Sequence, residues 1–135
     1  MYLLVGIWGD ENRRPAAIKF FIYTFFGSTV MLAGFLALGI LSGPSFSMEE
    51  VSTAGALSRT AQIAIAAPIL FGLLVKVPAV PFHSWLLDVY VSSPTSTNVV
   101  LSGVLPKLGT YGLIKIAVPL LPEGSQPFLP YLAAF

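Results

Sequence analysis

The amino-acid sequence predicts an all-α protein, a polytopic bundle of transmembrane helices, and three observations support this fold class. Apolar residues make up 56% of the 135 residues, and charged residues make up only 10%, against about 25% in soluble domains. The mean hydropathy is +0.84. Runs with few or no charges recur along the chain at the length of about 20 residues that a membrane-spanning helix needs. We therefore expect three full spans, one of them broken near Pro78 and Pro81, and a partial span at each end.

The expected spans follow one another with short polar connections between them. Their approximate ranges are 1–9 (partial), 16–41, 60–88 (broken), 94–121 and 127–135 (partial). The first range extends only about 13 Å at 1.5 Å per residue, which is less than half of a bilayer core. We interpret the chain as an internal fragment of a single larger transmembrane domain.

The first full span is expected to follow a charged turn. Pro15 suits the first turn of a helix, where its missing N–H costs nothing. Small residues in this span provide positions where a second helix can approach closely: Gly27, Ser28, Ala33 and Gly34. The connection over 43–58 is polar, and Ser47 with Glu50 fits a capping box, which predicts a short interfacial helix.

Prolines shape the second and third spans. The second span is expected to run to about Val80, where Pro78 and Pro81 break it, and a half-helix over 82–90 should follow. In the third span, Pro106 frees the carbonyl one turn earlier for a water molecule. Close helix packing is the best explanation for the three glycines of this span: Gly103, Gly109 and Gly112.

The composition argues against several classes of site and partner. The chain has no cysteine, so disulfides, thiolate metal sites and cysteine nucleophiles are excluded. With one histidine and no cysteine, a transition-metal or haem site is not expected. A net charge of +1 without a basic patch argues against a nucleic-acid partner and leaves the lipid bilayer as the expected environment.

Two lysines are the strongest functional candidates, because each is the only charged residue in an apolar run of membrane length. Lys76 is alone in 61–87, and Lys107 is alone in 89–114. A lysine at bilayer mid-depth costs about 3 kcal/mol on insertion scales and normally faces a bundle interior or a hydrated cavity. A structural lysine paired with a buried carboxylate is one interpretation of Lys76. We favour the other, a proton carrier that alternates between its charged and neutral forms.

Four further residues have roles that the sequence leaves open. His83 follows the proline break; a lone histidine usually packs, but a position in a broken helix gives a role in a proton path equal weight. Asp88 is either an interfacial charge or a conformational latch. Lys19 is interpreted as a lysine that snorkels to the interface, and Trp85 as an interface-belt or core residue.

The stretch from Val75 to Lys115, VKVPAVPFHSWLLDVYVSSPTSTNVVLSGVLPKLGTYGLIK, resembles the antiporter-like membrane subunits of respiratory complex I. The nearest branch of that family is subunit M, called subunit 4 in mitochondria. Its pattern runs K-x-P-x-x-P-x-H-x-W-L-P-D-A-H, then A-P-T, then L-L-K-x-G-x-Y-G-L. Residues 1–9 and 16–28 resemble the fifth and sixth helices of that subunit, so the resemblance runs from about the end of helix 5 to the start of helix 9.

The chain departs from this family pattern at a few places. Leu87 and Tyr90 stand where the pattern has a proline and a second histidine. A serine replaces the acidic residue that usually precedes A-P-T, and Pro106 occupies a position where leucine is common.

The resemblance implies a mechanism for the two lysines. Members of the family have fourteen transmembrane helices and couple NADH oxidation and quinone reduction, which occur elsewhere in the complex, to proton pumping. Lys76 would lie on the broken seventh helix and take and release the pumped proton. Lys107 would lie on the eighth helix and pass the proton along a central hydrophilic axis. The glutamate that pairs with the first lysine belongs to the fifth helix and is expected just before Met1.

The resemblance thus predicts a proton-translocating membrane subunit of an NADH:quinone oxidoreductase, a translocase in which this chain carries no redox site. NADH, FMN, iron–sulfur clusters and quinone would bind to partner subunits, and the nearest partners would be sibling antiporter-like subunits. A bacterial inner (plasma) membrane is the expected location. Two alternatives stay open: a Na⁺/H⁺ antiporter or membrane-bound hydrogenase subunit of the same superfamily, and a passive membrane scaffold whose lysines only pair with a neighbouring subunit.

Overall fold

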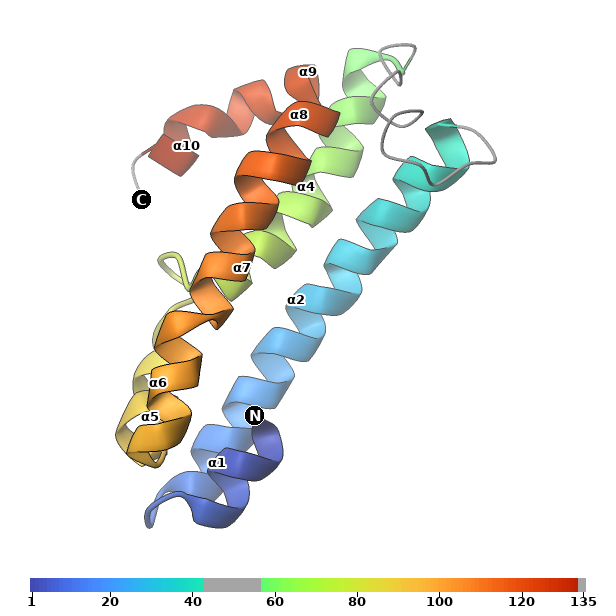
Figure 1. Cartoon of the computed structure of the whole chain (residues 1–135). Helices are drawn as coiled ribbons and strands as arrows, with labels where there is room; N and C mark the ends of the chain where they lie inside the picture. The colour runs from blue at the N-terminus through green and yellow to red at the C-terminus, as the bar shows by residue number, and fades with distance from the viewer. Residues whose placement is uncertain (43–56, 134–135) are drawn as a thin grey trace.

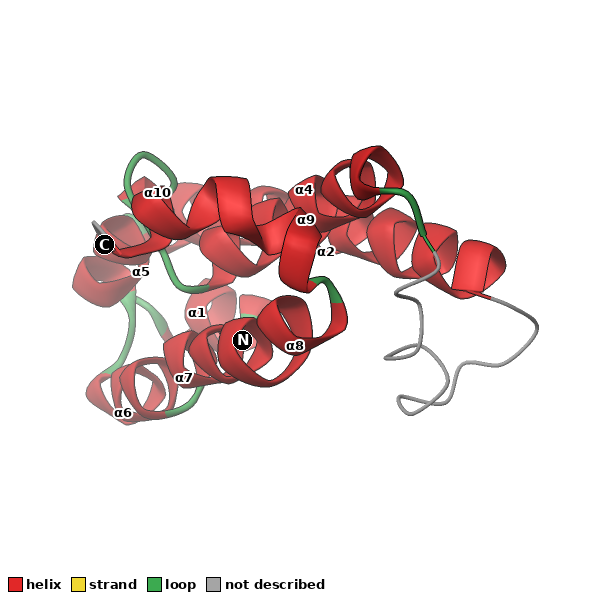
Figure 2. Ribbon diagram, turned by 90° about the horizontal axis from the view of Figure 1, so that it is seen from above, coloured by secondary structure: helices red, strands yellow, loops and turns green. Residues whose placement is uncertain are grey.

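The computed structural model describes residues 1–42 and 57–133, and within these ranges it is helical and contains no strand (Figure 2). The predicted all-α fold class is confirmed. The interfacial helix predicted at Ser47 and the last two residues of the chain lie outside the described residues. Three helical stretches in the described ranges are long and apolar enough to cross a membrane: Arg13–Ser42, Arg59–Lys76 and Thr95–Leu120.

Helices α1 (Tyr2–Trp8) and α2 (Arg13–Ser42) form a hairpin at the lower end of the molecule (Figure 1). Pro15 lies in the first turn of α2, as predicted. The 30 residues of α2 extend about 45 Å at 1.5 Å per residue, which exceeds a bilayer core of about 30 Å. Helix α2 therefore runs nearly the full length of the molecule (Figure 1).

Helix α4 (Arg59–Lys76) lies antiparallel to α2, and the two helices touch where one of them carries a glycine. A Cβ atom built on Gly27 would lie 3.0 Å from Val75 Cβ, and one on Gly34 would lie 2.7 Å from Ile69 Cγ1. A Cβ on Gly72 of α4 would collide with the carbonyl oxygen of Gly27. The close approach predicted at Gly27 and Gly34 is confirmed, and small residues set the distance between these helices.

The predicted break of the second span is confirmed, although α4 ends at Lys76 rather than near Val80. Pro78 explains the early end, because proline has no N–H to continue the ladder and disfavours the helical conformation of the residue before it. Helix α5 (Ser84–Ser92) resumes after the break and lies beside the start of α2 (Figure 1).

The third stretch consists of consecutive helical pieces: α6 (Thr95–Gly103), α7 (Leu105–Gly112), the π-helical segment η2 (Leu113–Ala117) and α8 (Val118–Leu120). The backbone departs from regular helix at Val104, where φ is −117°. This irregularity lies two residues before Pro106, whose missing N–H leaves one bond of the ladder unmade.

The end of the described chain folds back over the upper end of the molecule (Figure 1). It comprises α9 (Pro122–Ser125), the 3₁₀ turn η3 (Gln126–Phe128) and α10 (Leu129–Ala133). Gly124 of α9 packs on the start of α4, because a Cβ there would lie 2.5 Å from the carbonyl oxygen of Gln62.

Buried apolar residues form two separate clusters. The first is centred on α4 and comprises Leu38, Ile65, Ala66, Ile69, Leu70, Leu73, Ala117 and Leu121. The second joins α1, α2, α5 and α6 and comprises Val5, Ala17, Phe20, Trp85, Val89 and Leu101. The break after Lys76 therefore falls between two packed cores, with α4 belonging to one and α5 to the other.

Candidate functional site

Lys76 is the last residue of α4, and its side chain is half-buried. Two carbonyls of this last turn accept backbone hydrogen bonds: that of Leu73 from the N–H of Val77 (2.9 Å) and that of Leu74 from the N–H of Ala79 (3.0 Å). The helix thus closes regularly just as it reaches the lysine. Lys76 therefore lies where the chain leaves the helix, next to backbone N–H and C=O groups that have no hydrogen-bond partner within the helix.

Helix α7 packs directly against this end of α4. A Cβ atom on the buried Gly109 would lie 3.3 Å from Lys76 Cβ and 3.2 Å from the backbone nitrogen of Val77. One turn later, a Cβ on Gly112 would lie 2.8 Å from Leu73 Cδ2. The close packing predicted for Gly109 and Gly112 is confirmed. At Gly103 a Cβ would meet nothing within 4 Å among the described residues, so the close packing predicted there stays a prediction.

Lys107 belongs to the same helix as Gly109 but occupies its exposed side. Two residues along a helix differ by about 200° in direction, so Lys107 and Gly109 lie on nearly opposite faces of α7. The structure therefore brings the helices of the two lysines together at the level of Lys76. It leaves the Lys107 side chain on a surface that also carries exposed apolar residues, including Val104, Leu108 and Tyr111.

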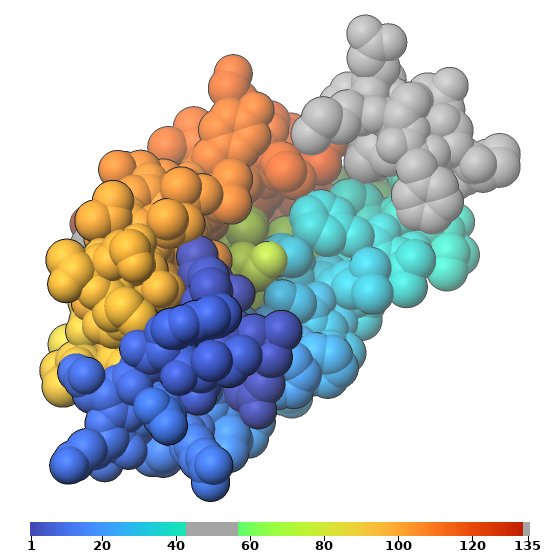
Figure 3. Space-filling model, turned by 60° about the horizontal axis from the view of Figure 1, so that its bottom comes forward, coloured from blue at the N-terminus to red at the C-terminus, as the bar shows by residue number. Residues whose placement is uncertain are grey.

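Neither Lys76 nor Lys107 forms an ion pair with a carboxylate of the described residues. Seen from the lower end, atoms of α4 lie at the bottom of a hollow between α2 and the α6–α7 stretch (Figure 3). The end of α4 is thus accessible from this side of the described chain. The sequence contains no mid-span carboxylate to serve as the partner of Lys76.

His83 precedes the first residue of α5 and is half-buried. Its Nδ1 atom is buried and has no hydrogen-bond partner among the described residues. Buried polar atoms in folded proteins nearly always have a partner, so this nitrogen requires water or another polar group. The imidazole is therefore not satisfied by packing within the described residues, and it lies on the far side of the break from Lys76.

Lys19 and Asp88 form an ion pair, with 2.7 Å between Nζ and Oδ2, and their side chains are 36% and 49% exposed. The interpretation of Lys19 as a lysine that snorkels to the interface stays a prediction, and the structure adds its partner: α5 lies along the start of α2 and brings the Asp88 carboxylate to it. The two residues are 69 positions apart, and no local signal connects them. A backbone hydrogen bond also holds α5 to the turn that precedes α2: the N–H of Asp10 donates to the carbonyl of Ser92 (3.0 Å).

We expect Asp88→Asn to lower the free energy of unfolding by no more than about 1 kcal/mol, because both partners are partly exposed and water screens the pair. Thermal unfolding of the full-length protein in detergent would measure this change. Lys19→Met and the double variant complete a double-mutant cycle. A coupling energy well above 1 kcal/mol would contradict the prediction and show that the pair is desolvated in the full protein.

The sequence allows two positions for Trp85, the interface belt or the core, and the structure places it fully buried in the second cluster. Its Nε1 donates to the carbonyl oxygen of Val75 at 3.2 Å. This bond reaches from α5 into the last turn of α4, one residue before Lys76. Sequence reasoning missed it because the position of one half-helix against the other depends on the path of the break.

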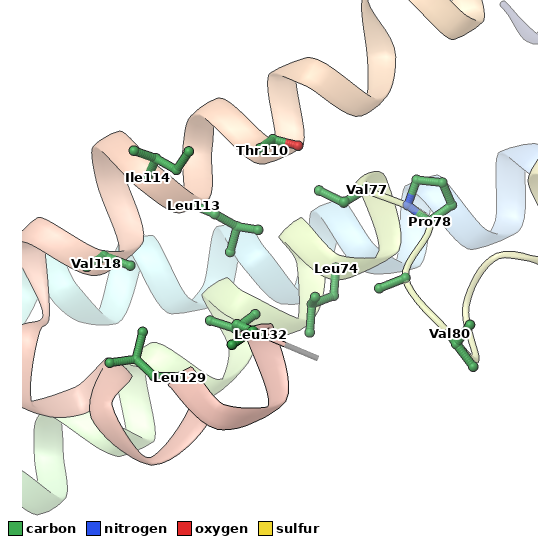
Figure 4. Close-up of a pocket in the computed structure, with 12 residues that line it drawn as sticks. Leu74, Val77, Pro78, Val80, Thr110, Leu113, Ile114, Val118, Leu129 and Leu132 are labelled. Carbon is green, nitrogen blue, oxygen red and sulfur yellow. The ribbon is translucent and has the colours of Figure 1, made fainter. Parts of the chain in front are cut away.

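An apolar cleft of about 610 Å³ lies beside the break, between the end of α4, the α7–η2 stretch and α10. Leu74 and Val77 line one side, and Thr110 and Ile114 line the other (Figure 4). The hydroxyl of Thr110 donates to the carbonyl of Pro106 (3.1 Å), so its proton is already used within α7. Neither lysine lines this cleft, which separates it from the proposed proton chemistry.

Known proteins resemble the chain over nearly its whole length. Residues 1–135 match the model of the family described as "NADH:quinone oxidoreductase/Mrp antiporter, TM". Subunit M of the NADH-quinone oxidoreductase of Rickettsia bellii is 42% identical over 134 residues, which cover 98% of this chain and 27% of the relative. Chain 4 of the NADH-ubiquinone oxidoreductase of Marchantia polymorpha is 36% identical over 133 residues, covering 98% and 26%.

A solved structure shares the fold. A chain of respiratory complex I from Thermus thermophilus with bound NADH matches with a TM-score of 0.84 and 29% sequence identity, and the match covers 97% of this chain and 28% of that chain. The chain therefore spans about a quarter of the length of the relatives that it matches.

Proposed function

The chain belongs to the NADH:quinone oxidoreductase/Mrp antiporter membrane family, and from this we propose that it takes part in moving protons across a membrane within an NADH:quinone oxidoreductase. The relatives named subunit M and chain 4 of that enzyme support this assignment over the Mrp antiporters. NADH, FMN, iron–sulfur clusters and quinone would then bind to partner subunits. Sibling antiporter-like subunits would be its neighbours in the membrane.

The observation that carries the proposal is the position of Lys76 at the end of a broken membrane helix. A lysine inside a continuous helix in lipid has no polar surroundings for its charged form. Beyond the end of α4, the irregular backbone over 77–83 carries N–H and C=O groups outside any helix, which supply polar surroundings for the ammonium group. Lys76 is therefore proposed as the group that takes up and releases the proton.

Lys107 is proposed as the onward acceptor. Contact between Gly109 and the last turn of α4 places the helix of Lys107 against the helix of Lys76. Because Lys107 lies on the face of α7 away from this contact, the proton would reach it through water or polar groups around α7.

His83 is proposed as a relay on the other side of the break. Its buried Nδ1 is without a hydrogen-bond partner among the described residues, and histidine is a common proton shuttle. A water molecule between the break and this nitrogen would satisfy the atom and extend the path.

The test is Lys76→Ala in the full-length protein, assembled into its complex and assayed for redox-driven proton transport. We expect transport per electron to fall by about tenfold or more, as for the loss of an essential acid–base group. Lys115→Ala is the matched control, since Lys115 is an exposed lysine of the η2 segment. Intact transport in the assembled Lys76→Ala complex would contradict the carrier role, and loss of assembly alone would favour the scaffold alternative.

The remaining alternative within the family is sodium–proton exchange, and one measurement distinguishes it. Transport by the wild-type complex should not depend on Na⁺ when K⁺ replaces it at constant ionic strength. The protein is an integral membrane protein, and the relatives from Rickettsia support a bacterial inner membrane as the location.

A further inference from the structure

Trp85 lies at the point where α2, α4 and α5 meet. It is in the first turn of α5, its side chain is 0% exposed, and its ring centroid lies 5.4 Å from that of Phe20 on α2. Its indole N–H donates to the carbonyl of Val75 at 3.2 Å. One side chain thus contacts the long helix and both halves of the broken one.

The hydrogen bond from Trp85 completes the end of α4. The carbonyls in the last turn of a helix have no partner within the helix. Backbone N–H groups from the break satisfy those of Leu73 and Leu74, and the carbonyl of Val75 is the next in order. Without the indole, this buried carbonyl would lack a partner in apolar surroundings, where water cannot readily replace it.

We propose that Trp85 is a positioning residue for Lys76: its N–H fixes the last turn of α4 and so sets the depth and direction of the lysine that follows Val75. The functional part of this inference rests on the proposed carrier role of Lys76. The geometric part does not, because it concerns only where the side chain at position 76 is held.

Two contacts hold α5 in place against the start of the chain, and through Trp85 they also determine where the end of α4 lies. The Lys19–Asp88 ion pair and the bond from the Asp10 N–H to Ser92 fix α5 along the start of α2. Trp85 then transmits this position to α4. Tryptophan suits the role because it combines a large apolar body with a single N–H donor, and phenylalanine would supply only the body.

The geometric test uses the absence of cysteine from the chain. Lys76→Cys introduces one thiol into this segment, and any cysteine elsewhere in the full-length subunit is replaced by serine. In the assembled complex, the rate of modification by a small water-soluble maleimide reports how accessible position 76 is. We expect Trp85→Phe to raise this rate several-fold, because the last turn of α4 loses a hydrogen bond and opens.

Phe20→Leu is the matched control, since it removes the aromatic contact and keeps the indole N–H. It should raise the rate less than Trp85→Phe. An unchanged rate in Trp85→Phe, or an equal rise in both variants, would overturn the inference. If Trp85→Phe does not assemble, replacement of Trp85 by benzothienylalanine, which has nearly the shape of tryptophan but no N–H, gives the same comparison.

The functional readout uses Trp85→Phe with Lys76 restored. We expect fewer protons moved per electron and an altered pH profile of transport, which a loss of packing alone would not produce. Intact transport in Lys76→Ala would contradict the carrier role and leave the thiol result standing. An unchanged thiol rate would overturn the positioning role and leave the carrier role standing.

Discussion

Gly72→Ala is expected to prevent the full-length protein from accumulating in a folded state. The added methyl group would collide with the carbonyl oxygen of Gly27 and would lie 2.5 Å from Met31 Cβ. One of these atoms is backbone and the other is the rigid base of a side chain, so neither can swing away. Helices α2 and α4 would have to separate along their whole contact.

The expected size of this effect follows from how membrane helices associate. Lipid is as apolar as the helices, so close packing supplies most of their attraction, and a small residue at the crossing point permits it. Overpacking a well-filled core, with the backbone shifts that it forces, typically costs about 1–3 kcal/mol and occasionally more. Against a net stability of about 5–15 kcal/mol, such a loss reduces folded protein strongly. Yield after membrane extraction and the unfolding temperature would both measure it.

Gly103→Ala provides the control for Gly72→Ala. Gly103 is also a helical glycine, but a Cβ there would meet nothing within 4 Å in the part of the chain that the structure describes. Alanine favours a helix over glycine by up to about 1 kcal/mol, so this variant should be as stable as the wild type or slightly more stable. Equal losses in the two variants would show that close contact at Gly72 does not hold α2 and α4 together.

The features that the sequence predicted well are those that one helix determines for itself. The length of α2 follows from an uncharged run, and the break follows from Pro78. The contact face of α2 follows from Gly27 and Gly34, because glycine in a membrane helix commonly marks close approach. Gly103 is a helical glycine without such a contact among the described residues, so the rule does not apply to every glycine within this part of the chain.

The features that escaped prediction depend on two segments at once. The Lys19–Asp88 pair and the bond from Trp85 to Val75 both require that α5 turn back beside α2 after the break. The backbone path through residues 77–83 decides the direction of α5. No periodic pattern in the sequence of these residues indicates that path. Lys76 was singled out by its energetic cost alone, and its carrier role stays a prediction. The exposed position of Lys107 was not predicted, because a helix pattern does not tell which neighbour covers each face.

Gly109→Ala is expected to impair proton transport more than assembly. A Cβ atom there would lie 2.6 Å from Val77 Cγ2, 3.2 Å from the Val77 nitrogen and 3.3 Å from Lys76 Cβ. The valine side chain can rotate, but the backbone nitrogen and the lysine Cβ cannot, so α7 must move away from the end of α4. This movement displaces the helix of Lys107 relative to Lys76. Misplacing a reacting group by about 1 Å can cost 100-fold in rate.

Gly112→Ala separates this displacement from a general loosening of the same interface. Its Cβ would meet the tip of the Leu73 side chain, Cδ2 at 2.8 Å, and a leucine tip can change rotamer. We expect Gly112→Ala to keep most of the transport and Gly109→Ala to lose most of it, in assembled complexes that oxidise NADH at comparable rates. Equal impairment would mean that transport requires tight packing along all of α7, and that the fit of this helix against Lys76 has no special part in it.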